Sequence, residues 1–223
     1  LAAKKNFRLL AGHTYFARFF PTPDDVLVNH HSIARDGQVY FGALKATVLD
    51  DEGTLRLGWW PGNEKLKHQA VEVKSPPLHS GEVPTVTLLE SEFDASQGLI
   101  LEGSFKLPAS KESQPVGLFL AQGKDSGTGI LVHAGGIAEF GPMRTDGTGF
   151  KAEQRVDREW NFGATVRFRL LLKGSLIEFY LDDLLMQCYS LPQKATGRLG
   201  ILCANDPNAV TALKAWRPGE LQP

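Results

Sequence analysis

Short alternating segments, separated by turn residues at regular intervals, constrain the fold of this chain more than any other feature. In "VRFRLLLKG" (166–174), the apolar residues at positions 166, 168, 170 and 172 share one face, and only Leu171 breaks the polar set on the other. An alternation of period two is typical of a strand with one buried face. The 23 glycines and 13 prolines favour frequent turns. The pattern therefore predicts an all-β fold.

The expected strands fall into two groups. In the first third of the chain "NEKLKHQ" alone has a helix-like pattern, and the strands are expected at 14–20, 26–34, 38–50 and 54–60. About eleven more strands follow, and we expect them at 85–93, 98–107, 116–123, 129–135, 137–141, 149–156, 165–174, 176–182, 184–191, 197–205 and 210–218. Two antiparallel sheets packed face to face would bury their inner faces and leave few edges.

A stretch rich in proline, glycine and serine, "KSPPLHSGEVP" (74–84), separates the two groups of strands. Two adjacent prolines in such a composition favour an extended connector. We therefore predict three parts of the chain. They are an antiparallel β unit at 1–74, a linker at 75–84 and a β-sandwich at 85–223.

Charge and composition argue against several classes of protein. The formal net charge is −1, with 24 Lys and Arg against 25 Asp and Glu, whereas a nucleic-acid-binding protein carries a basic surplus. No apolar run approaches the roughly 20 residues of a membrane helix. No Cys/His spacing typical of zinc occurs, so we predict neither a metal nor a cofactor. The sequence starts at Leu1 rather than at a methionine, which leaves the compartment open.

The sequence contains two cysteines, Cys188 and Cys203. The expected strands 184–191 and 197–205 form a hairpin around "PQKAT", which places the cysteines near each other but about two residues out of register. This geometry allows a disulfide without requiring one. We favour two small buried side chains, because cysteine is often buried for its packing alone.

The run "VRFRLLLKGSLIEFYLDDLLMQCYSLPQKATGRLGIL" (166–202) contains a strand, a second strand with an acidic residue between hydrophobics, a tight acidic turn, and a third strand that ends in an aromatic and Leu-Pro. This order resembles the C-terminal β-sandwich of the glycoside hydrolase family 32 enzymes, which is similar to the concanavalin A and laminin-G jelly rolls. Glu178, in "IEFYLDD", matches the acidic residue of the family. The strands and turns of 15–63 resemble the closing blade of the β-propeller that family 32 and family 43 enzymes place before the sandwich. The resemblance therefore implies a propeller blade, a linker and a jelly-roll sandwich.

The catalytic signatures of that family do not occur in this sequence. "NDPN" is found at 205–208, near the C-terminus rather than at the start of a propeller, so Asp206 is interpreted as a turn residue. A glycosidase needs two carboxylates about 5 to 10 Å apart, whereas Glu178 and Asp182 would be about 13 Å apart along one strand face. The catalytic residues are therefore unknown, and the resemblance implies that they lie upstream.

Two adjacent histidines, His30 and His31, lie within the expected strand 26–34. Neighbours on a strand point to opposite faces, so the two cannot ligate one metal there. The resemblance implies that an inner strand of the last blade lines the central channel of the propeller, and one of the two histidines would then line the sugar cleft. The alternative is a pair of polar residues on a half-exposed sheet.

Sugar-binding sites combine flat aromatic faces with planar polar groups. "DREWNFG" (157–163) has this composition in a loop-like context, and "GWWPGN" (58–63) carries two adjacent indoles that point in opposite directions on a strand. The candidate carbohydrate-binding residues are Trp160, Arg158, Asn161, Trp59 and Trp60.

The sequence leaves two functions open. In the first, the chain is the C-terminal portion of a family 32-like glycoside hydrolase, and the sandwich supports a sugar-cleaving propeller located upstream or in a second chain. In the second, the chain is a complete, non-catalytic carbohydrate-binding or adhesion module, like a lectin or a laminin-G domain. Both imply a carbohydrate partner, and neither implies nucleic acid or a membrane. The two functions differ in whether this chain is part of an enzyme.

Overall fold

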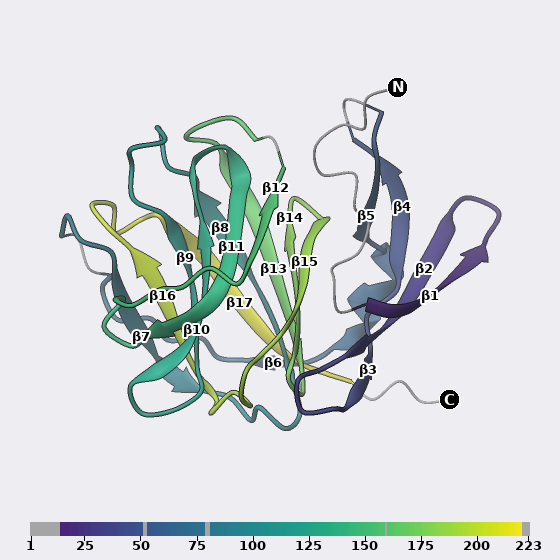
Figure 1. Cartoon of the computed structure of the whole chain (residues 1–223), viewed down its shortest axis with the longest axis horizontal. Coiled ribbons are helices and arrows are strands. Elements are labelled where there is room, and N and C mark those ends of the chain that lie inside the picture. The colour runs from purple at the N-terminus through teal and green to yellow at the C-terminus, as the bar shows by residue number, and fades with distance from the viewer. Residues whose placement is uncertain (1–13, 51–52, 79–80, 159, 220–223) are drawn as a thin grey trace.

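The computed structural model describes residues 14–50, 53–78, 81–158 and 160–219, which form an all-β fold, as predicted. The larger sheet, sheet A, has 11 strands in the order β1-β2-β4-β5-β15-β14-β13-β8-β17-β6, with β3 beside β2. The smaller sheet, sheet B, has 6 strands in the order β12-β11-β10-β9-β16-β7. Figure 1 shows β1 to β5 standing beside a sandwich made by the other strands.

The strands alternate with short turns along the chain. Those that precede the sandwich proper are β1 (Thr14–Pro21), β2 (Val26–Ile33), β3 (Val39–Phe41), β4 (Lys45–Leu49) and β5 (Leu55–Trp59). The strands of the sandwich are β6 (Lys67–Val71), β7 (Thr85–Glu92), β8 (Leu99–Lys106), β9 (Val116–Ala121), β10 (Ser126–Val132), β11 (Ile137–Arg144), β12 (Gln154–Asp157), β13 (Thr165–Lys173), β14 (Leu176–Leu181), β15 (Leu184–Ser190), β16 (Arg198–Cys203) and β17 (Val210–Pro218). The helical segments within the described residues are two 3₁₀-helices, η1 (Pro61–Leu66) and η2 (Ala134–Gly136). Within that part of the chain, no helix has the length and apolarity that a membrane span requires.

The space between the two sheets holds the main core of the sandwich. The predicted alternation is confirmed there, because Phe168, Leu170 and Leu172 of β13 and Phe179 of β14 belong to that core. Phe105 of β8 stacks on Phe168 with ring centroids 4.2 Å apart. Side chains at alternate positions of each strand therefore drive the two sheets together.

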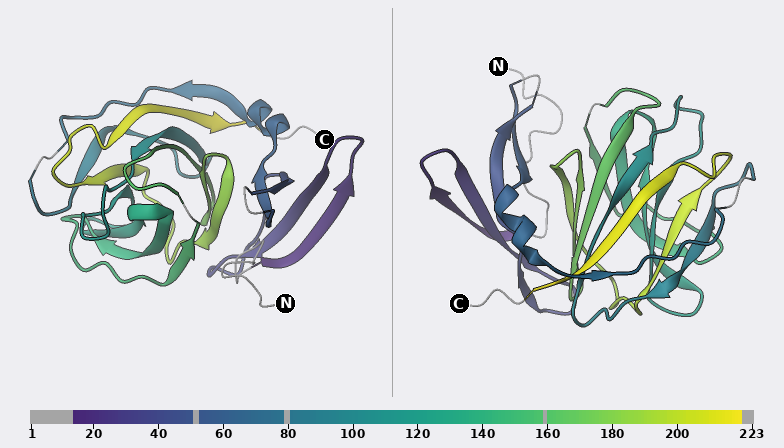
Figure 2. Two further views of the ribbon diagram at one scale, coloured as in Figure 1. Left: turned by 90° about the horizontal axis from the view of Figure 1, so that it is seen from above. Right: turned by 180° about the vertical axis from the view of Figure 1, so that it is seen from behind.

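A second core lies on the outer face of sheet A, which points away from sheet B. It joins Val28, Leu57 and Trp59 of the first unit to Leu171 and Tyr180 of the sandwich. Leu171, which breaks the polar set on its strand, is therefore buried under the first unit. Figure 2 shows this unit, β1 to β5, leaning against the sandwich on the side of β14 and β15.

The first unit continues sheet A through a narrow seam. β5 and β15 are paired at one position, Leu184 with Gly58, and the Trp59 amide donates to the Asp183 carbonyl at 2.7 Å. Asp182 and Asp183 make the predicted acidic turn, with φ values of 43° and 64°. Aspartate tolerates this left-handed conformation better than most residues, which explains the choice of side chain.

Two expectations about the strands are wrong in detail. The strand expected at 38–50 is divided into β3 and β4, because β3 pairs with the end of β2 and β4 pairs with its start, at Leu27 and Val28. The helix-like pattern at 63–69 overlaps η1 and then β6, which pairs with β17. Pro61 at the start of η1 fits the first turn of a helix, where its missing amide hydrogen is not needed.

The hairpin expected between 184–191 and 197–205 is also wrong. β15 belongs to sheet A and β16 belongs to sheet B, where it lies between β9 and β7. The connection crosses the end of the sandwich and buries Leu191 and Ala195 in the main core. Cys188 and Cys203 therefore lie in different sheets and are not joined by a disulfide.

The division into parts at 1–74, 75–84 and 85–223 stays a prediction. β6 lies before the expected linker and forms an edge of the sheet that the sandwich contributes, through its pairing with β17. The described residues between β6 and β7, which include those of the expected linker, belong to no strand.

Candidate functional site

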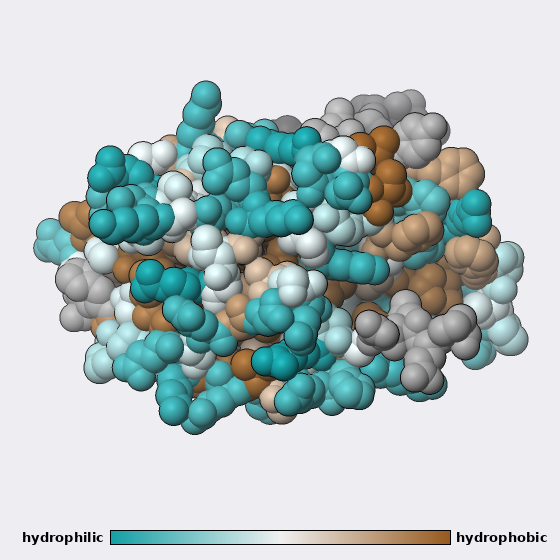
Figure 3. Space-filling view, turned by 90° about the horizontal axis from the view of Figure 1, so that it is seen from below, coloured by the Kyte–Doolittle hydropathy of each residue, from teal (hydrophilic) through white to brown (hydrophobic). Residues whose placement is uncertain are grey.

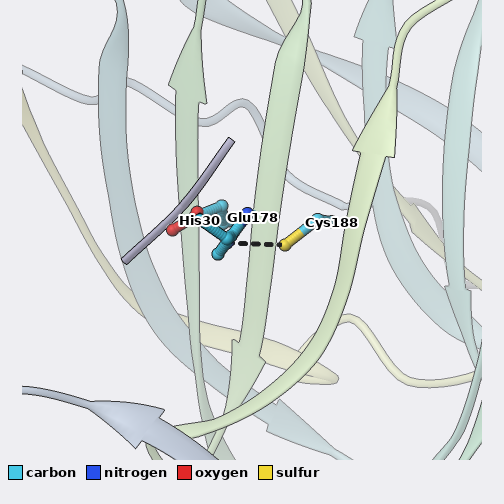
Figure 4. A group of neighbouring side chains, drawn as sticks. All are labelled: His30, Glu178 and Cys188. Carbon is cyan, nitrogen blue, oxygen red and sulfur yellow. Dashed lines mark hydrogen bonds and ion pairs between the residues drawn. The ribbon is translucent and has the colours of Figure 1, made fainter. Parts of the chain in front are cut away.

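A buried group of polar side chains connects the first unit to the sandwich. We call it the junction cluster, and it consists of His30 from β2, Lys45 from β4, Glu178 and Tyr180 from β14, and Cys188 from β15. None of these residues is more than 2% exposed. Figure 4 shows His30, Glu178 and Cys188 pointing toward one another between the strands. The cluster is therefore sealed between two parts of the chain that are distant in sequence.

Glu178 lies at the centre of the junction cluster. Lys45 Nζ donates to Glu178 Oε1 at 2.5 Å and to the Ala43 carbonyl at 2.7 Å. Tyr180 donates its hydroxyl proton to Glu178 Oε2 at 2.8 Å. His30 Nε2 is 3.3 Å from Glu178 Oε1, so both carboxylate oxygens have partners.

The surroundings of Glu178 keep it ionised. Burial acts to raise the pKa of Glu178, but Lys45 and the hydrogen bond from His30 outweigh it and lower the pKa to about 2. Burial lowers the pKa of His30, so its imidazole is neutral at neutral pH. Burial likewise raises the pKa of the Cys188 thiol and of the Tyr180 hydroxyl, so both keep their protons. The cluster is thus one ion pair surrounded by neutral groups.

The ligand atoms of His30, Glu178 and Cys188 all lie within 4.8 Å of one another, a spacing that could hold a metal ion. His30 Nε2 is 3.5 Å from Cys188 Sγ. The Lys45 ammonium, however, already contacts Glu178 Oε1 at 2.5 Å, and its charge opposes the binding of a cation there. These three side chains therefore fit a structural contact between the two parts of the chain better than a metal site.

Gly42 makes the junction cluster sterically possible. A Cβ atom at position 42 would lie 2.2 Å from Glu178 Oε1 and 2.7 Å from His30 Nε2. The amide of Gly42 donates to the His30 carbonyl at 3.1 Å, which holds the backbone against β2. The break between β3 and β4 therefore includes a position at which the backbone passes close to Glu178 and His30.

The structure places the two adjacent histidines on opposite faces of β2. His30 belongs to the junction cluster and is completely buried. His31 is half-buried and lies beside Phe41 and Phe16, with ring centroids 4.2 and 6.0 Å away. That one of them lines a sugar cleft stays a prediction.

The two indoles of "GWWPGN" differ in burial. Trp59 is buried, donates its Nε1 proton to Glu64 Oε1 at 2.9 Å, and lies under the Arg169 guanidinium at 4.1 Å. Trp60 is half-buried and covers Gly62, where a Cβ atom would lie 2.2 Å from the Trp60 ring. Their role in sugar binding stays a prediction.

The three candidates near residue 160 do not share one environment. Trp160 packs against the main core and donates its Nε1 proton to Asp182 Oδ2 at 3.2 Å. Arg158 is 7% exposed and burial lowers its pKa to about 10, while Asn161 is exposed. The structure brings Trp160 to the acidic turn of the β14–β15 hairpin, and the binding of sugar by this group stays a prediction.

The junction cluster contains two residues that the sequence did not single out, Lys45 and Tyr180, whereas Cys188 is buried, as predicted. One signal was present, because Leu171 and Tyr180 interrupt the polar faces of their strands. Both interruptions are buried against the first unit. An apolar residue in a polar strand face can therefore indicate a second packing partner.

No protein-family model matches this sequence, and no curated protein matches it. The structure is similar to a sucrose-6-phosphate hydrolase from Lactobacillus gasseri, with a TM-score of 0.62 and 14% identity, over 96% of this chain and 43% of the hydrolase. It is also similar to the Aspergillus kawachii beta-fructofuranosidase, with a TM-score of 0.60 and 10% identity, over 94% of this chain and 46% of that enzyme. The chain spans less than half the length of either protein. In its fold, the chain thus resembles part of these two enzymes, which confirms the family 32-like fold that the run 166–202 predicted.

Proposed function

We propose that this chain is the C-terminal portion of a family 32-like glycoside hydrolase, in which the sandwich supports a sugar-cleaving propeller. The proposal extends to this chain the activity that the names of the two similar structures describe, a hydrolase and a fructofuranosidase. The first unit, β1 to β5, would be the last blade of that propeller. The rest of the propeller would lie upstream or in a second chain.

The observation that carries the proposal is an exposed apolar surface on the first unit. Among the residues that the structure describes, eleven large hydrophobic residues are exposed, and nine of them lie in β1 to β5: Phe16, Phe19, Phe20, Val26, Ile33, Val39, Phe41, Leu49 and Leu55. We call these nine residues, which include neighbours on opposite faces of β1, the blade surface. In Figure 3, hydrophobic side chains gather at the end of the molecule where the first unit lies. Apolar surface concentrated in this way marks a site of contact with another protein surface.

The junction cluster supports the same assignment. It attaches the first unit to the sandwich through a buried ion pair, while the residues of the blade surface remain exposed. A small antiparallel unit buries too little area to be stable alone and needs packing on its faces. The sandwich covers one part of the unit, and neighbouring blades would cover the rest.

The carboxylates of this chain fit a supporting role better than a catalytic one. Glu178, the acidic residue that matches the family, is 1% exposed and paired with Lys45. A sugar cannot reach a carboxylate that is sealed in this way, and hydrolysis requires two carboxylates on either side of the bond. The proposal therefore locates catalysis in the upstream propeller.

The test uses the protein as its native gene produces it. We expect a denatured mass above 24.4 kDa, or a tightly bound second chain, together with hydrolysis of sucrose or of a fructan. Phe19→Ser on the blade surface should reduce the hydrolysis or the amount of bound second chain. Phe162→Ser, which alters a similarly exposed phenylalanine outside β1 to β5, serves as the matched control. A native product of 24.4 kDa with no partner and no hydrolysis would refute the proposal.

A second candidate function is a non-catalytic carbohydrate-binding or adhesion module. The observation that favours it is the main core, because its buried residues run from Leu89 to Ala215 and include none from the first unit. The sandwich therefore has the core of a module that does not depend on a propeller. Glycan binding by this chain alone, without hydrolysis, would support this function over the first.

A further inference from the structure

The residues of the blade surface are divided between two faces of the first unit. Side chains of cross-strand partners, and of every second residue along a strand, share one face of a sheet. His31 is paired with Phe16 on one side and with Phe41 on the other. Five residues of the blade surface therefore share the face of His31, and they are Phe16, Phe20, Ile33, Val39 and Phe41. We call these five residues the aromatic face.

The aromatic face points away from the junction cluster. His30, the neighbour of His31 on β2, is completely buried on the opposite face of the strand. Each residue of the aromatic face, in contrast, is at least 41% exposed. Figure 2 shows β1 and β2 as a hairpin that projects from the rest of the molecule. The sandwich therefore leaves this face uncovered.

An arginine lies in the middle of the aromatic face. Arg18 is two residues from Phe16 and two from Phe20 on β1, and its guanidinium lies over the Phe16 ring at 5.5 Å. A cation–π contact of this kind holds the charge against the apolar surface. The cross-strand partner of Arg18 is Asn29, which is neutral. Within the part of the chain that the structure describes, no carboxylate forms an ion pair with Arg18.

The strands around Arg18 supply no acidic side chain to this face. Within β1, β2 and β3 as the structure describes them, the residues on the face of His31 are apolar apart from Arg18, Asn29 and His31 itself. A second copy of this chain, packed by the same face, would bring a second arginine and no carboxylate, because an isologous contact repeats one surface. A partner that complements Arg18 must therefore have a different surface.

Covering the aromatic face would remove Arg18 from water. Exposed apolar surface that is concentrated in this way marks a site of contact with another protein surface. A charge enclosed by such a contact is costly unless it is paired and hydrogen-bonded. A carboxylate is the partner that an arginine binds most strongly, through two parallel hydrogen bonds. The surface that covers the aromatic face therefore needs a carboxylate opposite Arg18.

We infer that a β-sheet of the remaining propeller packs on the aromatic face and that a carboxylate of that sheet pairs with Arg18. The inference rests on the proposed function, to which it adds the chemistry of the surface that covers the first unit. More than half of each of the two similar enzymes lies outside the part that this chain matches, which leaves room for such a sheet. A sheet fits the aromatic face because sheets pack on one another through their apolar faces.

The first experiment places Arg18→Met in the native gene product. This variant keeps an apolar side chain in the contact and leaves the opposing carboxylate buried without a partner. If the rest of the propeller is a second chain, its binding should weaken about tenfold or more. If the propeller is continuous with this chain, the temperature at which hydrolysis is half lost should fall further than in the control. Arg144→Met is the matched control, because Arg144 is an exposed arginine of sheet B that pairs with Asp146 nearby.

Two further variants separate the charge from the covering of the face. Arg18→Lys keeps the positive charge and should retain more binding or heat resistance than Arg18→Met, although lysine cannot form the bidentate pair. Phe41→Ser should weaken the same assembly because Phe41 belongs to the covered face. Phe162→Ser, at a similarly exposed phenylalanine outside the first unit, should have little effect.

Three results in an active native product would each overturn the inference. The first is an Arg18→Met product that is as stable as the original or more stable, as an apolar cover without a carboxylate would produce. The second is an Arg18→Lys product that loses as much as Arg18→Met. The third is a Phe41→Ser product that behaves like Phe162→Ser. A native product without a propeller and without hydrolysis refutes the proposed function itself, so the two failures are distinguishable.

Discussion

Replacing Glu178 by glutamine tests the central claim about the junction cluster. The change keeps the size of the side chain, removes its charge and replaces one acceptor oxygen by an amide donor. Lys45, which is 0% exposed and whose ammonium is 2.5 Å from Glu178 Oε1, is then left as a buried cation without a carboxylate. The expected result is a large loss of stability with no change in the surface of the protein.

The size of the loss follows from two independent estimates. Breaking a buried ion pair by removing one partner costs about 3 to 5 kcal/mol. A Glu178 pKa lowered from 4.5 to about 2 corresponds to about 3 kcal/mol at neutral pH. For a chain of this size, about 3 to 5 kcal/mol lowers Tm by about 6 to 20 °C.

The assay is thermal unfolding followed by circular dichroism at pH 7. Glu139→Gln is the matched control, because Glu139 forms ion pairs with His133 and Arg155 at the surface of sheet B. Such pairs contribute at most about 1 kcal/mol, so the control should change Tm little. The double variant with Lys45→Met should recover part of the loss, because it removes the uncompensated cation.

Two results would refute the reasoning. The first is a Glu178→Gln variant whose Tm falls no further than that of Glu139→Gln. The second is a double variant that is as unstable as Glu178→Gln alone. Either result would show that the buried charges do not control the stability of this junction.

Three further predictions concern the same region. Acid should destabilise the chain in two stages. The stability that neutral His30 contributes is present above pH 6.5 and lost below it, and the stability that ionised Glu178 contributes is present above pH 4.5 and lost between pH 4.5 and about 2. A Tm that stays constant from pH 8 to pH 3 would contradict this prediction. Gly42→Ala should lower the free energy of unfolding by more than 1 kcal/mol in urea titrations, because its Cβ atom would clash with Glu178. Cys188, buried and with a raised pKa, should resist iodoacetamide in the folded chain and react after unfolding, as peptide mass spectrometry can measure.

The alternation of side chains predicted most of the fold. Periods of two residues located nearly all the strands, and the buried faces of β13 and β14 are those that the pattern indicated. The pairing of strands was less predictable, because alternation tells which face is buried and does not tell which neighbour a strand pairs with. β15 and β16 follow each other in the chain and lie in different sheets for this reason.

The junction cluster could not be predicted because its members are far apart in sequence. Lys45 and Glu178 are separated by 133 positions, and each alone is typical of a solvated strand face. The adjacent histidines showed the same limit, since the strand geometry put them on opposite faces without telling which face would be buried. The burial of each of these residues depends on which distant part of the chain packs against its strand face.

The junction cluster has a consequence for how such proteins can be recombined. Lys45 and Gly42 come from the first unit, whereas Glu178 and Cys188 come from the sandwich. Recombination between two diverged genes, at a point between these two groups of residues, would join the first-unit residues of one protein to the sandwich residues of the other. A hybrid that inherits Lys45 without a carboxylate at position 178 would bury an orphaned cation. We therefore expect the two segments to be inherited together, and productive exchanges to occur outside the interval from His30 to Cys188.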